Sequence, residues 1–140
     1  MDVLDLRFSS MIGLRRSTRP DLGTLCLEET PAVHNHLGTI HAAAQFALAE
    51  AATGDFLQSS FPALAPSCIG VVRRSGVTYR GPARGTVYAA ATVEEQKLRE
   101  FEARLTARGR AFISINVVVS DATGAVTMSG EVEWFVQKPA

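Results

Sequence analysis

Residues 33–50 read VHNHLGTIHAAAQFALAE, a polar segment that leads directly into an alanine-rich, almost wholly apolar helix. The helix is expected to begin near Gly38 or Thr39 and to end at Gly54, with Thr39 as its N-cap, because alanine favours helix and threonine favours the capping position. A helix that is apolar nearly all round is a buried helix. The polar segment before it gathers five hydrogen-bonding side chains: His34, Asn35, His36, Thr39 and His41.

Glu50 is the single acid of this predicted helix and lies near its far end. A buried carboxylate without partners costs several kcal/mol, so it is either satisfied by a partner or used for chemistry. Two interpretations therefore stand: a structural acid held by the helix-end amides of a neighbour, and a catalytic acid.

The composition predicts one globular domain that spans residues 1–140. Hydrophobic residues make up 46% of the chain and charged residues 20%, which is typical of globular proteins and not of disordered ones. The 14 basic and 14 acidic residues balance, so no excess positive field exists to attract nucleic acid or an anionic membrane. Neither class of partner is expected.

The N-terminus lacks the basic and apolar regions of a signal peptide, and the longest apolar stretch is too short to span a bilayer. A cytoplasmic location is therefore expected. Cys26 and Cys68 lie far apart without a CxxC spacing, so they predict buried reduced thiols and no zinc or redox site.

The rest of the chain predicts an α+β domain with an antiparallel sheet of five to six strands curled round the apolar helix. A short helix is expected within the first dozen residues, and an amphipathic helix over residues 94–108, packed on the sheet or serving as a lid or partner-binding helix. Period-two alternation predicts the strands. They are residues 24–29, residues 68–80 with a kink at Gly76, residues 86–93, and a closing hairpin over residues 113–120 and 126–136.

The residues at the start of the apolar helix resemble those of the hotdog-fold acyl-CoA thioesterases, the group of the phenylacetic-acid-degradation and hydroxybenzoyl-CoA thioesterases. That group has an N-x-x-G-x-x-H-G-G run with an acid nine residues after the histidine, and Asn35, Gly38, His41 and Glu50 keep this spacing. The chain departs from the pattern where Ala42-Ala43 replaces Gly-Gly, and in its longer insertion at residues 94–108. It is also similar to an uncharacterised domain-of-unknown-function branch of the superfamily.

The resemblance implies hydrolysis of a small or medium acyl or aryl thioester, with coenzyme A as part of the substrate and no separate cofactor. Glu50 is then the general base or nucleophile, and the Ala42 N–H at the helix N-terminus is the oxyanion donor. Eight residues separate them, a rise of roughly 12 Å along a helix, which is too far for both to reach one carbonyl. The site is therefore expected at the interface of a homodimer, or of a dimer of dimers, with antiparallel helices.

Further roles follow for other residues of this region. Asn35 orients the substrate or the water, or serves the turn. Gly38 and His41 shape and brace the turn, while Thr53 holds a water near Glu50. The arginines expected to bind the coenzyme A pyrophosphate, or else to be solvated strand charges, are Arg73, Arg74, Arg80 and Arg84. His34 and His36 have the spacing of a metal pair in extended chain, but no further ligands cluster nearby, so no metal is expected.

Two other functions remain open at this stage. A hotdog acyl-CoA hydratase or dehydratase pairs a histidine with an acid, yet nine residues turn a helix by about 180°, so His41 and Glu50 do not share a face. A non-catalytic carrier of acyl groups or other hydrophobic ligands is kept open by the Ala42-Ala43 pair.

Overall fold

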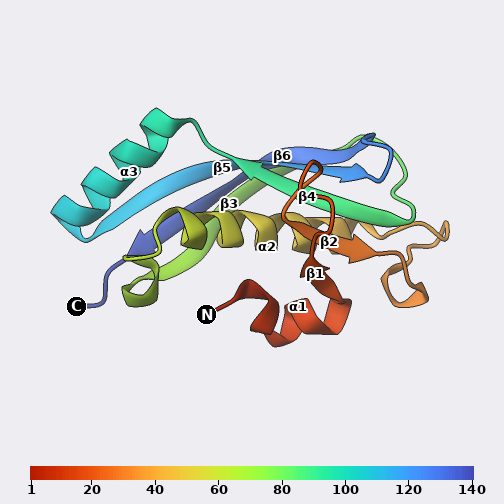
Figure 1. Ribbon diagram of the computed structural model, residues 1–140, viewed down its shortest axis with the longest axis horizontal. Coiled ribbons are helices and arrows are strands. Elements are labelled where there is room, and N and C mark those ends of the chain that lie inside the picture. The colour runs from red at the N-terminus through yellow and green to blue at the C-terminus, as the bar shows by residue number, and fades with distance from the viewer.

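The computed structural model describes residues 1–140, with one long helix held against a six-stranded sheet (Figure 1). The elements follow in this order along the chain: η1 Val3–Asp5, α1 Arg7–Ile12, β1 Leu14–Arg16, β2 Leu25–Glu28, η2 Pro31–Val33, α2 Ala42–Ser60, η3 Ala65–Ser67, β3 Ile69–Tyr79, β4 Thr86–Thr92, α3 Glu95–Arg108, β5 Arg110–Asp121 and β6 Val126–Gln137. The predicted α+β class is confirmed.

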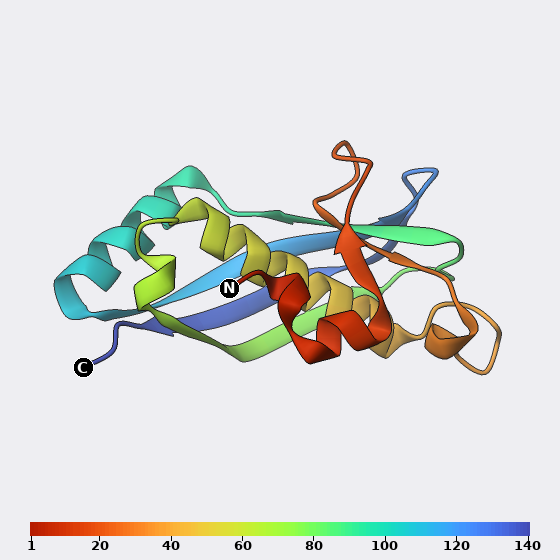
Figure 2. The ribbon, with the colours of Figure 1, turned by 60° about the horizontal axis from the view of Figure 1, so that its bottom comes forward.

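The sheet has the strand order β1-β2-β4-β5-β6-β3, and every neighbouring pair is antiparallel. It curves over one side of α2, while the N-terminal segment lies across the opposite side of that helix (Figure 2). Leu48, Ala49 and Ala52 of α2 are completely buried, because their small and branched side chains pack against the inward-facing residues of the sheet. The expected buried central helix is confirmed.

The predicted ends of α2 were wrong at both sides. The helix begins at Ala42, with His41 as the N-cap, and Thr39 lies before it in a turn. It also continues through Gly54 to Ser60. Gly54 does not stop the helix because its role is close packing: a Cβ there would lie 3.3 Å from two ring atoms of Trp134.

The N-terminal helix is confirmed as α1, but the strand that follows it, β1, was not predicted. Its three residues pair with β2, with Leu14 buried and Arg15 exposed. A strand of three residues is too short for the alternation of apolar and polar side chains to be recognised in the sequence. Arg16 joins the N-terminus to α2. Its guanidinium donates to Asp2 at 2.9 Å and to Asp55 of α2 at 2.7 Å.

Strand β3 is an edge strand, and its irregularity lies elsewhere than predicted. The register against β6 shifts between Val72 and Arg74, so the extra residue is Arg73 and not Gly76. Gly76 keeps a regular place opposite Glu131 and needs no kink. Only β6 pairs with β3, so the other edge of this eleven-residue strand is free.

The predicted amphipathic helix is confirmed as α3, which packs on the sheet beside β5. Phe101 and Leu105 are buried against the residues of β5 and the end of α2, and this agrees with the packing interpretation of the helix. Cys26 is buried, whereas Cys68 is partly exposed, contrary to expectation; both are free thiols. None of the helices combines the length and the apolar character that crossing a membrane requires.

Candidate active site

The polar segment before α2 forms a tight turn that presents the start of the helix. The Asn35 carboxamide oxygen accepts from the backbone N–H groups of Leu37 and Thr39, and its Nδ2 donates to the Thr39 hydroxyl at 2.8 Å. Gly38 sits at φ +72°, the left-handed region that glycine enters without strain, and its N–H donates to the Asn35 carbonyl. The turn role of Asn35 and Gly38 is therefore present, and one Asn35 N–H stays free for another acceptor.

His41 braces the N-terminus of α2, as expected. Its Nδ1 accepts from the Ala43 N–H at 2.9 Å, while its carbonyl oxygen accepts from Ala44 and Gln45. The Ala42 N–H is thereby left as the first-turn amide without a partner in the chain, and Ala42 and Ala43 are both exposed. An unpaired N–H at the positive end of a nineteen-residue helix is suited to stabilise an oxyanion.

Tyr79 is a residue of this region that the sequence analysis missed. Its hydroxyl donates to the Ala42 carbonyl oxygen at 3.0 Å, and burial raises the pKa of Tyr79, so the hydroxyl keeps its proton. The bond fixes the last residue of β3 to the first residue of α2. The one sequence signal that could have indicated Tyr79 is the alternation of β3, which places it on the inward face of the sheet.

Glu50 lines a mostly apolar cavity and has no hydrogen-bonding or ionic partner in the chain. Desolvation is the only cause acting on this carboxyl, and it raises the pKa of Glu50. The cavity has a volume of about 630 Å³, and fifteen of its 22 lining residues are hydrophobic. The chain itself thus supplies no partner for this carboxyl group.

Thr53 does not hold a water beside Glu50, so this prediction was wrong. Its side chain is completely buried; the hydroxyl donates to the Glu50 carbonyl oxygen at 2.7 Å and accepts from Trp134 Nε1 at 2.9 Å. The hydroxyl proton is therefore committed to the backbone, and Thr53 instead ties α2 to β6.

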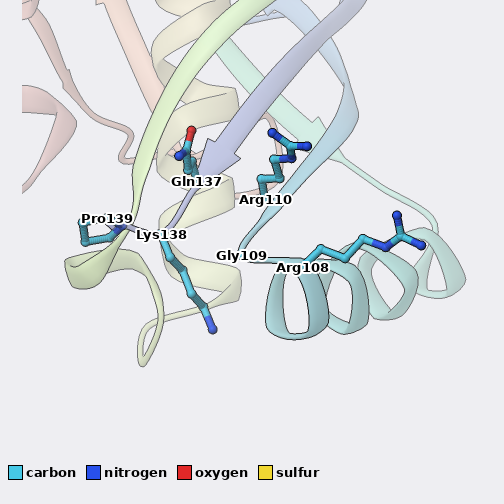
Figure 3. A pocket seen from close by; sticks show the side chains of 6 residues that line it. All are labelled: Arg108, Gly109, Arg110, Gln137, Lys138 and Pro139. Carbon is cyan, nitrogen blue, oxygen red and sulfur yellow. The ribbon is translucent and has the colours of Figure 1, made fainter.

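The four arginines predicted to bind the coenzyme A pyrophosphate do not lie together in one site. Arg73 and Arg74 both face Glu133, at 3.6 and 3.7 Å, and Arg73 also covers the Phe112 ring. Arg80 donates to the Ser129 hydroxyl, and Arg84 is exposed. A second hollow at the far end of the sheet holds Arg108, Arg110 and Lys138, but their side chains point in different directions (Figure 3). None of these sets forms a ready clamp for a pyrophosphate.

His34 and His36 do not act together. His34 Nε2 lies 3.0 Å from the Glu29 carboxylate, which also accepts from the Gly85 N–H, and the two bonds join the turn before α2 to the loop before β4. The Gly85 N–H, followed by His34, lowers the pKa of Glu29. His36 is exposed, and no three potential metal ligands cluster anywhere in the chain.

The structure thus divides the predicted site residues into two groups on one helix. Asn35, Gly38, His41 and Ala42 gather at its N-terminus, and Glu50 lies in its third turn beside the cavity. Residues 8–136 match the family described as domain of unknown function (DUF4442). The chain belongs to this family. No curated protein matches it.

Solved structures similar to this DUF4442 chain share its whole architecture. A Pseudomonas aeruginosa protein of unknown function, PA5026, named a probable thioesterase, has a TM-score of 0.80 at 23% identity, over 98% of this chain and 91% of that one. BH2602 from Bacillus halodurans, solved with CoA, gives 0.70 at 18%, over 92% and 74%. A variant of the Staphylococcus aureus thioesterase enzyme SAV0944 gives 0.72 at 16%, over 96% and 100%. The predicted hotdog fold is confirmed.

Proposed function

We propose that this DUF4442 protein is an acyl-CoA thioesterase in which Glu50 acts on the thioester. The observation that carries the proposal is a carboxyl group that lines a mostly apolar cavity, has no partner in the chain and has a raised pKa. Such a group is a stronger base than an exposed glutamate, and its desolvation has no structural compensation within the chain. The thioesterase names of PA5026 and SAV0944 agree with this choice of chemistry.

The reaction uses two groups with separate tasks. Glu50 takes a proton from a water molecule whose oxygen attacks the thioester carbonyl carbon, or attacks that carbon itself as a nucleophile. The charge that develops on the carbonyl oxygen is stabilised by a free helix N-terminal N–H, that of Ala42. The C–S bond then breaks and the coenzyme A thiolate leaves; in the general-base route it takes the proton that Glu50 removed from the water. In the nucleophilic route the thiolate is protonated by solvent, and a water molecule then hydrolyses the acyl-Glu50 anhydride, which releases the acid and restores the carboxylate.

The two groups come from different chains in this proposal. Within one chain, Ala42 and Glu50 are eight residues apart on one continuous helix, or roughly 12 Å. The free edge of β3 supports a two-fold pairing, because one row of backbone N–H and C=O groups along its eleven residues has no partner strand, and such an edge is prone to pair with another strand. A two-fold axis through this edge reverses the direction of the second α2, so that Glu50 faces Ala42 of the partner subunit.

Coenzyme A is the proposed leaving group because BH2602, which has the same fold, is solved with CoA. The four arginines first considered for its pyrophosphate remain candidates, Arg80 and Arg84 ahead of Arg73 and Arg74. Both of the former follow the end of β3 that Tyr79 fixes to the N-terminus of α2. The latter pair already faces Glu133.

A panel of aliphatic and aryl acyl-CoAs, with the released thiol detected by a dye, tests the proposed function. We expect purified protein to release free coenzyme A from at least one apolar acyl-CoA well above the uncatalysed rate. Hydration of an enoyl-CoA without free thiol contradicts the proposal and supports a hydratase. Binding of acyl-CoA without turnover of any member contradicts it as well and supports a carrier.

A further inference from the structure

The cavity beside Glu50 is built from parts of the chain that lie far apart in sequence. It is lined by residues from the N-terminal segment 1–9, by α2 from Ala47 to Gln58, by the segment from Phe61 to Cys68, by Gly70 of β3, by Phe101 and Leu105 of α3, and by the inner face of β6. Trp134 lies on the inner face of β6, with Gly54 and Gly70 beside its ring. A volume of about 630 Å³ lies well within the range of small-molecule sites, roughly 300–1,000 Å³.

The N-terminal segment covers one side of this cavity and is held there by a clasp. Val3 is buried against α2, and Leu6 and Phe8 line the cavity while remaining about half exposed. Arg16 holds Asp2 and Asp55 together, which ties the first residues of the chain to α2. Figure 2 shows this segment lying along α2 on the side away from the sheet.

The chemistry of the lining selects for an uncharged, apolar ligand. No lysine or arginine side chain lines the cavity, and its one charged side chain is Glu50, which repels the carboxylate of a dicarboxylic acyl group. The lining also contains the hydroxyl-bearing Ser9 and the amide-bearing Gln58. Most of the lining is thus apolar, and Glu50 is its one acid.

We propose that this cavity receives the acyl chain of the thioester, that its ligands are uncharged medium to long acyl groups, and that residues 1–9 form the wall against which the chain packs. The proposal rests on the proposed function for the identity of the thioester. Because Glu50 lines the cavity, a thioester carbonyl carbon beside its carboxyl group leaves the hydrocarbon to occupy the apolar remainder.

Gly70 offers a direct test, because a side chain there projects into the cavity without a clash. A Cβ at Gly70 would meet the Trp134 ring at 3.5 Å, which is ordinary contact, whereas a Cβ at Gly76 on the same strand meets nothing within 4 Å. Gly70→Leu therefore fills the cavity, and Gly76→Leu is the matched control on the opposite face of β3. The probes are non-hydrolysable S-alkyl-CoA thioethers from ethyl to hexadecyl, with affinity measured by calorimetry.

We expect the affinity of the wild type and of Gly76→Leu to rise by up to about fourfold for each methylene that enters the cavity. In Gly70→Leu the affinity should stop rising at a shorter alkyl chain. For the longest probe this variant should bind at least about tenfold more weakly than the wild type. Affinities independent of chain length, or a Gly70→Leu profile equal to that of the wild type, overturn the proposal. Because hydrolysis plays no part, a protein that binds in this way without thioesterase activity refutes the proposed function alone.

The wall is tested separately with Phe8 and Met11, two exposed residues of α1. Phe8 lines the cavity and Met11 does not. We expect Phe8→Ala to lower the affinity for the long thioethers about fivefold, since an aromatic side chain contributes a large contact area. The affinity for ethyl-CoA should change little. Met11→Ala should match the wild type. Equal behaviour of the two variants overturns the role of the N-terminal segment.

Discussion

Replacing Glu50 by glutamine is expected to lower kcat for acyl-CoA hydrolysis by about 100-fold to 10,000-fold, the usual contribution of a positioned base. The substitution keeps the size and shape of the side chain and removes only the base. Steady-state kinetics on the best substrate of the wild type measure the loss. An exposed acid of α3, Glu102, gives the control: Glu102→Gln should retain full activity.

Stability and pH separate this role from a structural one. Because burial raises the pKa of Glu50 in the folded protein, its ionisation lowers stability as the pH rises from about 4.3, the usual glutamate value, through the raised value. Glu50→Gln should thus unfold no more easily than the wild type at neutral pH. Activity of the wild type should fall as the pH drops through the raised pKa, since the base becomes protonated. A destabilised variant with full residual kcat contradicts the account.

Replacing Ala42 by proline is expected to lower kcat by about 100-fold to 1,000-fold without unfolding the helix. Proline lacks the N–H that we assign to the oxyanion, yet the first helical position tolerates it well. The preceding residue, His41, is already extended at φ −61° and ψ 141°, which is the conformation that proline requires before it. The lost N–H makes no hydrogen bond in the chain, so no contact of the fold is broken.

Ala42→Gly is the matched control for that variant, because it restores the glycine of the thioesterase pattern and keeps the N–H. We expect it to retain activity within about tenfold of the wild type, with a small loss of stability from glycine in a helix. Thermal unfolding of all three proteins checks that the helix persists. Full activity in Ala42→Pro would show that the Ala42 N–H is not the oxyanion donor.

The sequence was enough to predict the fold because its strongest patterns report on burial. The alanine-rich face of α2 and the alternation of β5 and β6 follow directly from which side chains face the core. The C-terminal end of α2 escaped prediction because it depends on a contact distant in the chain, whereas the N-terminal end was misplaced because a histidine side chain provides the cap through a local bond. Trp134, eighty residues away, explains why Gly54 lies inside the helix, and the His41 ring replaces Thr39 as the cap.

The sequence predicts candidate residues for the site but not their arrangement. The spacing from Asn35 to Glu50 predicted a turn followed by a helix that carries the acid, and the structure has the turn before α2 and Glu50 within α2. Thr53 could not be assigned from spacing, because its partner Trp134 lies on β6. The cavity could not be predicted either, because it forms only when residues 1–9 fold back over α2.

A subunit-mixing experiment tests most directly whether each site joins the acid of one chain to the amide of the other. Glu50→Gln and Ala42→Pro chains carrying different affinity tags are co-expressed, and the mixed dimers are isolated by both tags. Two mutations then fall in one site and none in the other, so the mixed dimers should recover about half of the wild-type activity although each parent has almost none. Mixed dimers no more active than the parents, or a chain that is monomeric while active, would contradict the account.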